Sequence, residues 1–248
     1  MKISTFLKIS AFVCLTVLCA FLISATRPAK TKVMIFSKTN GFRHASIPVG
    51  IAAIRKLGEE NNFDVDATED SSLFRSDNLK KYAVLIFLSP TGKVFGPDEE
   101  KALQQYMHSG GGYVGIHAAT DCEYNWPWYG DLVGAYFLKH PKQQTAKFLV
   151  VDKNNPATSF LPDVWERFDE LYNFKYVNPK IHVLIKIDEK SYDPGDGAMG
   201  DFHPMSWCHE YEGGRAFYTE LGHTDESYSD PNYLKHILGG IQWAMGKK

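Results

Sequence analysis

The sequence lacks any surplus of positive charge. Its 27 Lys and Arg residues are balanced by 29 Asp and Glu residues, which gives a formal net charge of -2 over 248 residues. A surface that binds nucleic acid needs clustered positive charge to displace the counterions of the phosphates, so we expect no nucleic-acid partner. Repeats, linkers and low-complexity tracts are also missing, and the 44% hydrophobic and 23% charged residues are typical of a globular protein. These features exclude a disordered or fibrous protein and favour one folded domain.

Cysteine is scarce, with four residues in the whole chain. Two of them, Cys14 and Cys19, lie in the apolar N-terminal stretch, which leaves Cys122 and Cys208 for the folded part. An exported protein could join these two in a disulfide, but the sequence separation does not show whether their Cα atoms come close enough. Two buried, unpaired thiols are the other interpretation.

The N-terminus has the pattern of an export signal. Lys2 and Lys8 precede residues 9–25, which are apolar apart from two serines and a threonine. We expect residues 1–25 to be a signal peptide, with 26–31 as a short linker and 32–248 as the mature domain, in the periplasm. The apolar stretch reaches the lower length limit of a membrane span, so a periplasm-facing anchor is the alternative, and we expect membrane contact through this segment alone.

Alternating strand and helix patterns predict an α/β domain with a mainly parallel sheet. The pattern predicts strands over 32–37, 63–67, 82–88 and 113–116, separated by helices over 47–62 and 97–108. In the C-terminal half it predicts further strands over 145–151, 167–174, 182–187, 204–211 and 215–221, before a closing helix over 231–245. Ligands of such sheets bind beyond the carboxyl ends of the parallel strands, so we expect the site there.

Two segments lie at such strand ends. Residues 38–44 follow the first strand and contain Arg43 and His44, which could meet an oxyanion or sugar hydroxyls; alternatively, Arg43 is a surface cation and His44 caps the next helix. Residues 110–119 have the geometry of a nucleophile elbow, a sharp turn with small neighbours that displays one side chain, here His117. Imidazole lacks the hydroxyl or thiol of an ordinary acyl-transfer nucleophile, so the roles open to His117 are general base, hydrogen-bond donor and metal ligand. Alternatively, His117 is a buried residue hydrogen-bonded to the backbone.

The nine histidines and the 14% aromatic residues suit a sugar or metal site. No pair of histidines has the four-residue spacing of a helical zinc motif, so a metal site would have to be assembled from separate loops. The candidates for such a site are His140, Glu170, His203 and His223, if these histidines do not simply face solvent. The aromatic segment 124–129 could stack on a sugar ring, although packing across a loop is the commoner use of such residues.

Several ordered motifs resemble the ThuA-like, or trehalose-utilisation, family. They are residues 36–47, 110–121, 126–130 with 140–141, 169–172, 203–207, 213–215 and 221–224. The resemblance covers 32–246 and implies a flavodoxin-like, class I glutamine amidotransferase-like three-layer sandwich with extra β-strands in the C-terminal half. It also implies that histidine, as His117, takes the position of the amidotransferase cysteine, so that the protein is not a cysteine-dependent glutaminase.

The resemblance further implies a role in carbohydrate catabolism at one histidine-rich pocket. We expect an enzyme that acts on a glycoside or keto-sugar as a hydrolase, lyase or isomerase, or alternatively a non-catalytic saccharide-binding protein. An assembly of identical subunits is compatible with either. A divalent metal such as zinc would suit the cleft. The expected residues are His117, Glu170 and His44 for catalysis, Arg43, Asp121, Trp126, Trp207 and His140 for substrate binding, and His203 and His223 for the metal.

Overall fold

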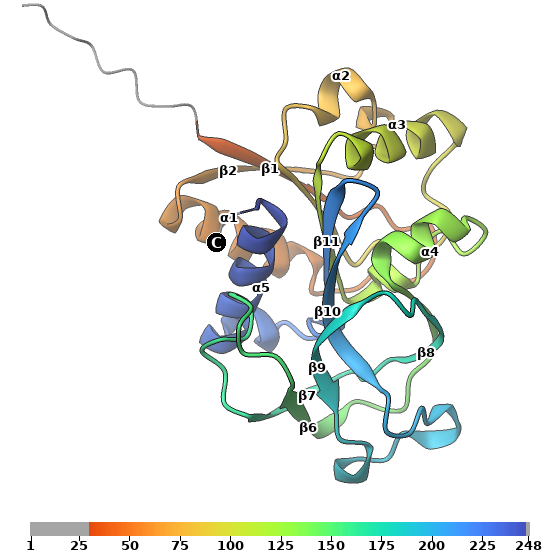
Figure 1. Ribbon diagram of the computed structural model, residues 1–248, viewed down its shortest axis with the longest axis vertical. Helices are drawn as coiled ribbons and strands as arrows, with labels where there is room; N and C mark the ends of the chain where they lie inside the picture. The colour runs from red at the N-terminus through yellow and green to blue at the C-terminus, as the bar shows by residue number, and fades with distance from the viewer. Residues whose placement is uncertain (1–29, 247–248) are drawn as a thin grey trace, which may run out of the picture.

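The computed structural model describes residues 30–246, so the expected export segment 1–25 lies outside the described residues. Strands and helices alternate through the first half of the chain (Figure 1). The strands are β1 Thr31–Phe36, β2 Phe63–Thr68, β3 Val84–Leu88, β4 Gly112–Ile116, β5 Ala135–Lys139, β6 Gln144–Val150, β7 Val164–Asp169, β8 Asn173–Val177, β9 His182–Ile187, β10 Pro204–Tyr211 and β11 Gly214–Thr219. The α-helices are α1 Ile47–Glu60, α2 Ser76–Leu79, α3 Pro97–His108, α4 Pro127–Val133 and α5 Pro231–Ala244.

Nine of the strands form one sheet in the order β2-β1-β3-β4-β11-β10-β9-β6-β7, and β5 and β8 form a separate pair. The strands from β2 to β11 pair in parallel, whereas those from β11 to β7 pair antiparallel. The strand direction reverses at each antiparallel pair, so β9, two pairs away from β11, runs in the same direction as β11. For the same reason β7 runs in the same direction as β9. The carboxyl ends of β1, β3, β4, β11 and β7 therefore lie at the same edge of the sheet.

Helices cover both faces of this sheet, which confirms the expected three-layer α/β fold (Figure 1). Ile54 of α1 and Ile237 of α5 pack with one core cluster, and Leu103 of α3 and Leu132 of α4 pack with the other. The central strand β3 is buried at every position, as its unbroken Val-Leu-Ile-Phe-Leu sequence requires when both faces are covered. The hydrophobic effect on both faces thus holds the sheet in the middle of the molecule.

Sequence patterns located most of these elements. Helix α3 begins at Pro97 as expected, with Glu99 accepting the backbone N–H of Gly96 at 2.9 Å, and it ends at His108. The expected strand over 167–174 is wrong, because β7 ends at Asp169 and β8 begins at Asn173. Between them Glu170, Leu171 and Tyr172 cross the carboxyl edge of the sheet, and β8 then pairs with β5 outside the sheet. The aromatic segment 124–129 runs into helix α4.

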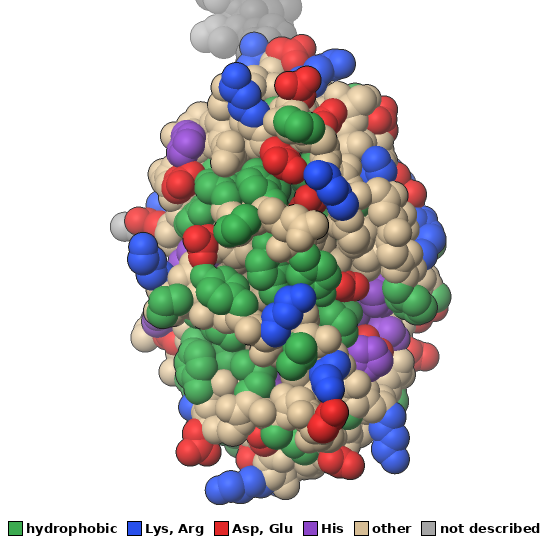
Figure 2. All heavy atoms as spheres, turned by 90° about the vertical axis from the view of Figure 1, so that its right-hand side faces the viewer, with side chains coloured by type: hydrophobic (Ala, Val, Ile, Leu, Met, Phe, Trp, Pro, Cys, Tyr) green, Lys and Arg blue, Asp and Glu red, His purple; other side chains and the backbone are tan. Residues whose placement is uncertain are grey.

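Charges of both signs are mixed on the face shown in Figure 2, where hydrophobic side chains also gather and histidines reach the surface near both margins. No helix within residues 30–246 combines the length and the apolar sequence that crossing a membrane requires.

Candidate functional site

Four side chains with metal-binding atoms meet at the carboxyl edge of the sheet. His44 lies in the loop after β1, His117 directly follows β4, Glu170 directly follows β7, and His223 lies in the turn after β11. One ligand atom from each lies within 4.8 Å of the others. We call this set the His/Glu cluster. The topology explains the convergence, because these are the strands whose carboxyl ends share one edge.

His117 occupies a sharp turn. Its φ of 50° is in the left-handed region, which is uncommon for a residue with a side chain. The preceding Gly115 is needed because a Cβ there would lie 2.9 Å from the Tyr218 ring and 3.2 Å from the Cβ of Ala119. The strand therefore ends in an elbow that displays His117, as the sequence predicted, but a 3-10 turn over His117–Thr120 follows it instead of an α-helix.

The tautomer of His117 follows from its backbone contact. Its Nδ1 lies 2.7 Å from the carbonyl oxygen of Glu220, which can only accept, so Nδ1 carries a proton. In the neutral ring Nε2 then presents a lone pair, and it lies 3.4 Å from Glu170 Oε2 and 3.1 Å from His223 Nδ1. Histidine ligands of metals are typically oriented by such a hydrogen bond on the second nitrogen.

One proton of His223 lies between two acceptor atoms of the cluster. His223 Nδ1 lies 3.0 Å from Glu170 Oε2 and 3.1 Å from His117 Nε2, so in this arrangement it donates toward both. Burial disfavours the charged form of His223, but the hydrogen bond and charge of Glu170 outweigh burial and raise its pKa. Burial likewise disfavours ionised Glu170, yet the close His117 and His223 rings lower its pKa below the ordinary value. A cation could replace the shared proton.

His44 completes the cluster as a neutral imidazole. Its side chain is buried, and burial, followed by the proximity of His117 and His223, lowers its pKa to about 3. Its Nδ1 has no hydrogen-bond partner within residues 30–246. A buried polar atom without a partner is costly, and a bound ion or water is the usual remedy.

Asp169 fixes the backbone on both sides of the cluster. This fully buried carboxylate accepts the N–H groups of Glu170 at 3.0 Å, Gly222 at 3.0 Å and His223 at 3.1 Å. Arg167 donates to it at 3.0 Å. The loops that carry Glu170 and His223 are therefore tied to one anion. Asp169 lies in the 169–172 motif, but the sequence assigned it no role.

A cavity of about 430 Å³ opens beside the cluster. The expected residues His44, Glu170, His223, Asp121 and His140 line it. Burial raises the pKa of Asp121, although the Tyr124 hydroxyl donates to its carboxylate at 2.6 Å. His140 Nδ1 lies 3.3 Å from Glu170 Oε1.

Four further residues of the cavity wall were not predicted, namely Phe42, Phe137, Gln143 and Tyr172. Phe42 and Tyr172 lie inside motifs that the sequence singled out, and their position beside His44 and Glu170 was the available signal. Phe137 belongs to β5 and Gln143 to the following turn, on either side of the 140–141 motif, and no residue pattern pointed to either of them.

Two residues that we expected in the site lie away from the His/Glu cluster: His203, expected to bind the metal, and Trp207, expected to bind the substrate. Both assignments are corrected. His203 is buried between Glu189 and the Tyr172 carbonyl, with contacts of 2.8 Å at each ring nitrogen, so both nitrogens are already engaged. Trp207 is fully buried, donates to the Val133 carbonyl at 2.9 Å and stacks on Tyr218. It is a core residue because its strand position faces the α4 layer.

Arg43 and Trp126 are also absent from the cavity wall. Arg43 is exposed and forms an ion pair with Glu69 at 2.7 Å, which is the surface role that the sequence left open for it. Trp126 stacks on Trp128, with ring centroids 5.0 Å apart, so the aromatic segment packs on itself. The stacking residues available to a ligand are instead Phe42, Phe137 and Tyr172.

The two cysteines of the described part are buried and unpaired. Burial raises the pKa of Cys122 well above its ordinary value and that of Cys208 to about 12. Neither lines the cavity, so neither thiol is placed to act as a nucleophile there.

Comparison with solved structures finds similar folds. A ThuA-like protein from Bacteroides uniformis is 26% identical with a TM-score of 0.73, over 88% of this chain and 93% of that one. A ThuA-like protein from Parabacteroides merdae is 22% identical with a TM-score of 0.72, over 88% and 91%. A β-galactosidase from Bacillus circulans is 13% identical with a TM-score of 0.57, over 89% of this chain but 32% of its own, and shows the fold alone. None of the curated proteins compared matches the sequence.

A family model described as "ThuA: Trehalose utilisation" matches residues 32–244, which include the sheet from the second residue of β1 onward and all four members of the His/Glu cluster. The family indicates a carbohydrate-related role. The chain therefore belongs to the ThuA, or trehalose-utilisation, family.

Proposed function

We propose that the protein is a metal-dependent enzyme of carbohydrate metabolism that acts on a glycoside or keto-sugar. The convergence of His44, His117, Glu170 and His223 within 4.8 Å, from four separate strand ends, carries the proposal. His44, His117 and Glu170 are buried and His223 is half-buried. Such groups are costly to bury unless they are hydrogen-bonded, paired or bound to an ion.

The donor set fits a divalent first-row cation such as zinc. Imidazole nitrogen and carboxylate oxygen are its ordinary ligands, His117 has its tautomer fixed for ligation, and His44 Nδ1 has no other partner within residues 30–246. When bound, the cation would supply charge stabilisation for an oxyanion formed on the sugar.

The cavity supplies groups for substrate binding and proton transfer. Asp121 lines the cavity, and burial raises its pKa, which makes it the candidate to exchange a proton with a sugar oxygen or an adjacent carbon. His140 contacts Glu170 Oε1, whereas His117 contacts Oε2, and the His140 ring can donate to sugar hydroxyls. Phe42, Phe137 and Tyr172 offer apolar faces for a sugar ring.

Elemental analysis of protein purified without added metal, together with incubation with disaccharides and their 3-keto derivatives, tests this function. We expect about one divalent ion per chain and a new product by mass spectrometry, lost on treatment with a chelator. Metal-free protein that converts a sugar would refute the metal site. Ligand-induced thermal stabilisation without conversion of any sugar would instead support the non-catalytic saccharide-binding function.

We also propose that the protein is exported to the periplasm. Two lysines followed by the apolar residues 9–25 support this location. Fractionation of cells that express the full chain tests it, with the N-terminal sequence of the recovered protein distinguishing a cleaved signal from a retained anchor.

A further inference from the structure

A second groove adjoins the cavity of the His/Glu cluster. It has a volume of about 610 Å³ and shares Gln143 with the first cavity. Its other lining residues are Arg167, Phe168, Thr224, Glu226, Ser227 and Asp230. They come from the end of β7 and from the segment after β11, which are the same two segments that carry Glu170 and His223. The two hollows therefore form neighbouring compartments at one edge of the sheet.

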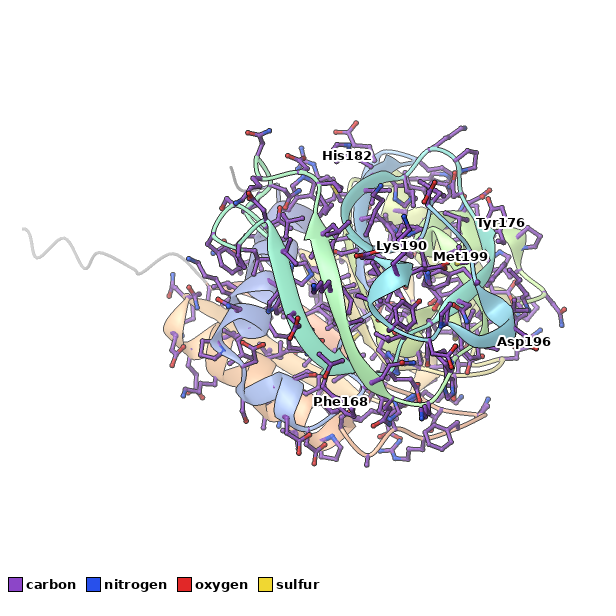
Figure 3. The ribbon with its side chains drawn as sticks, turned by 90° about the horizontal axis from the view of Figure 1, so that it is seen from below. Phe168, Tyr176, His182, Lys190, Asp196 and Met199 are labelled. Carbon is purple, nitrogen blue, oxygen red and sulfur yellow. The ribbon has the colours of Figure 1, made fainter. Side chains whose placement is uncertain are left out.

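The second groove combines an exposed aromatic ring with polar groups. Phe168 is 51% exposed although it lies in a β-strand. Figure 3 shows it at one end of the β6–β7 pair, on the opposite side of the molecule from His182. Around it stand two carboxylates, two hydroxyls and an amide from Asp230, Glu226, Thr224, Ser227 and Gln143. A sugar ring needs this combination, because its C–H face packs on an aromatic ring while its hydroxyls bind polar groups at the edge.

Fixed contacts connect this groove to the cluster. Arg167 lines the groove and is held by Ser227 at 2.6 Å and by Asp169 at 3.0 Å. Asp169 in turn holds the backbone N–H of His223. The groove is thus built on the same anchored framework as the cluster, and a ligand bound in it would have a defined position relative to the cluster.

We propose that the Phe168 groove binds the second ring of a two-ring saccharide whose reacting ring lies in the cavity at the His/Glu cluster. This inference rests on the proposed function, since it assigns the part of the substrate that lies beyond the reacting ring. Phe168 is the specificity-determining residue of this subsite, and Gln143 lies at the boundary between the two rings.

Binding of matched sugars to the metal-loaded protein tests the subsite. The probes are the 3-keto derivatives of trehalose, cellobiose and sucrose, compared with methyl 3-keto-α-glucoside, which has one ring. We expect at least one of the disaccharides to bind about tenfold more tightly than the methyl glucoside. Phe168→Ala should remove this advantage and leave binding of the methyl glucoside unchanged. The control Phe202→Ala, at a comparably exposed phenylalanine that lines neither hollow, should change neither affinity.

The outcomes separate the two proposals. If the methyl glucoside binds but no disaccharide binds more tightly, or if Phe168→Ala leaves the disaccharide advantage intact, the subsite is refuted while the proposed function stands. If the protein binds neither metal nor any of these sugars, both are refuted. Equal weakening of one-ring and two-ring sugars in Phe168→Ala also refutes the subsite, because the substitution would then act on the first cavity.

Discussion

His117 shows how one residue serves both the fold and the site. It follows strand β4, has a left-handed backbone conformation, and donates from Nδ1 to the Glu220 carbonyl, which leaves Nε2 toward Glu170 and His223. The sequence predicted the elbow from its small neighbours. It did not predict the hydrogen bond that fixes the ring, because that contact joins residues 117 and 220, which are distant in sequence.

Replacing His117 tests its role directly. His117→Gln should abolish stoichiometric metal binding and lower kcat by on the order of 100-fold or more, because one of four converging donors is lost. Elemental analysis and kinetics with a converted sugar measure the effect. His182→Gln is the matched control, since His182 is 61% exposed and pairs with Asp152 away from the cluster. Retention of metal and of full activity in His117→Gln would remove His117 from the site.

Asp169 is a positioning residue, and its substitution should weaken the site without touching a ligand atom. Asp169→Asn keeps the shape of the side chain but removes the charge that accepts the N–H groups of Glu170, Gly222 and His223. We expect metal affinity to fall by about 10- to 100-fold, as for groups that orient metal ligands. Competition with a chromogenic chelator measures this affinity at a temperature where both proteins are folded. An unchanged affinity in a folded variant would show that the ligands are positioned by other contacts.

At the scale of the elements, periodicity and capping predicted the chain well where each element lies within the sheet or covers one of its faces. Helix α3 and strand β3 follow from proline, acidic residues and an unbroken apolar run. The expected strand 167–174 fails because the break at Glu170 depends on where the antiparallel strands end in three dimensions. The His/Glu cluster has one feature that local sequence predicts and one that depends on tertiary packing. Its strand-end positions were predictable, whereas the choice of His223 over His203 depends on packing between β9, β10 and the 189–203 segment.

Helix α5 gives the protein a buried histidine that should affect its stability at acid pH. His236 is fully buried, with contacts to the Ala157 carbonyl at 2.8 Å and to Ser206 at 3.3 Å. Burial lowers its pKa to about 4, and nearby Arg167 acts in the same direction. Between about pH 6.5 and pH 4, His236 is protonated in the unfolded chain but stays neutral in the folded protein. The free energy of unfolding should therefore fall as the pH drops from about 6.5 to about 4.

The size of this effect follows from the pKa difference. Each unit contributes about 1.4 kcal/mol, so His236 should account for a loss of about 3 kcal/mol over this range. Urea unfolding at several pH values measures this loss. In His236→Gln, which keeps a donor for the Ala157 carbonyl, the free energy of unfolding should depend less steeply on pH, with about one proton fewer taken up on unfolding. Identical slopes for the two proteins would mean that His236 has the same pKa in the folded and unfolded states.

At the scale of the whole molecule, the cluster joins distant parts of the chain. His44 belongs to the loop after β1, and His223 to the turn before α5, so the four donors tie the N-terminal parallel half of the sheet to the C-terminal antiparallel half. A cation bound by all four would bind the folded state and not the unfolded chain. Its binding free energy would therefore add to the stability of the entire domain.

Thermal unfolding with and without metal should reveal this coupling. At a free metal concentration about 100 times the Kd, binding adds about 2.7 kcal/mol, which corresponds to a rise in Tm of about 5 to 10 °C for a domain of this size. Differential scanning calorimetry of protein stripped with a chelator, then titrated with zinc, measures the rise. His117→Gln should show almost none of it, while His182→Gln should keep it in full. A rise of equal size in His117→Gln would mean that the cation stabilises the fold from another position, and the His/Glu cluster would lose its assignment as the metal site.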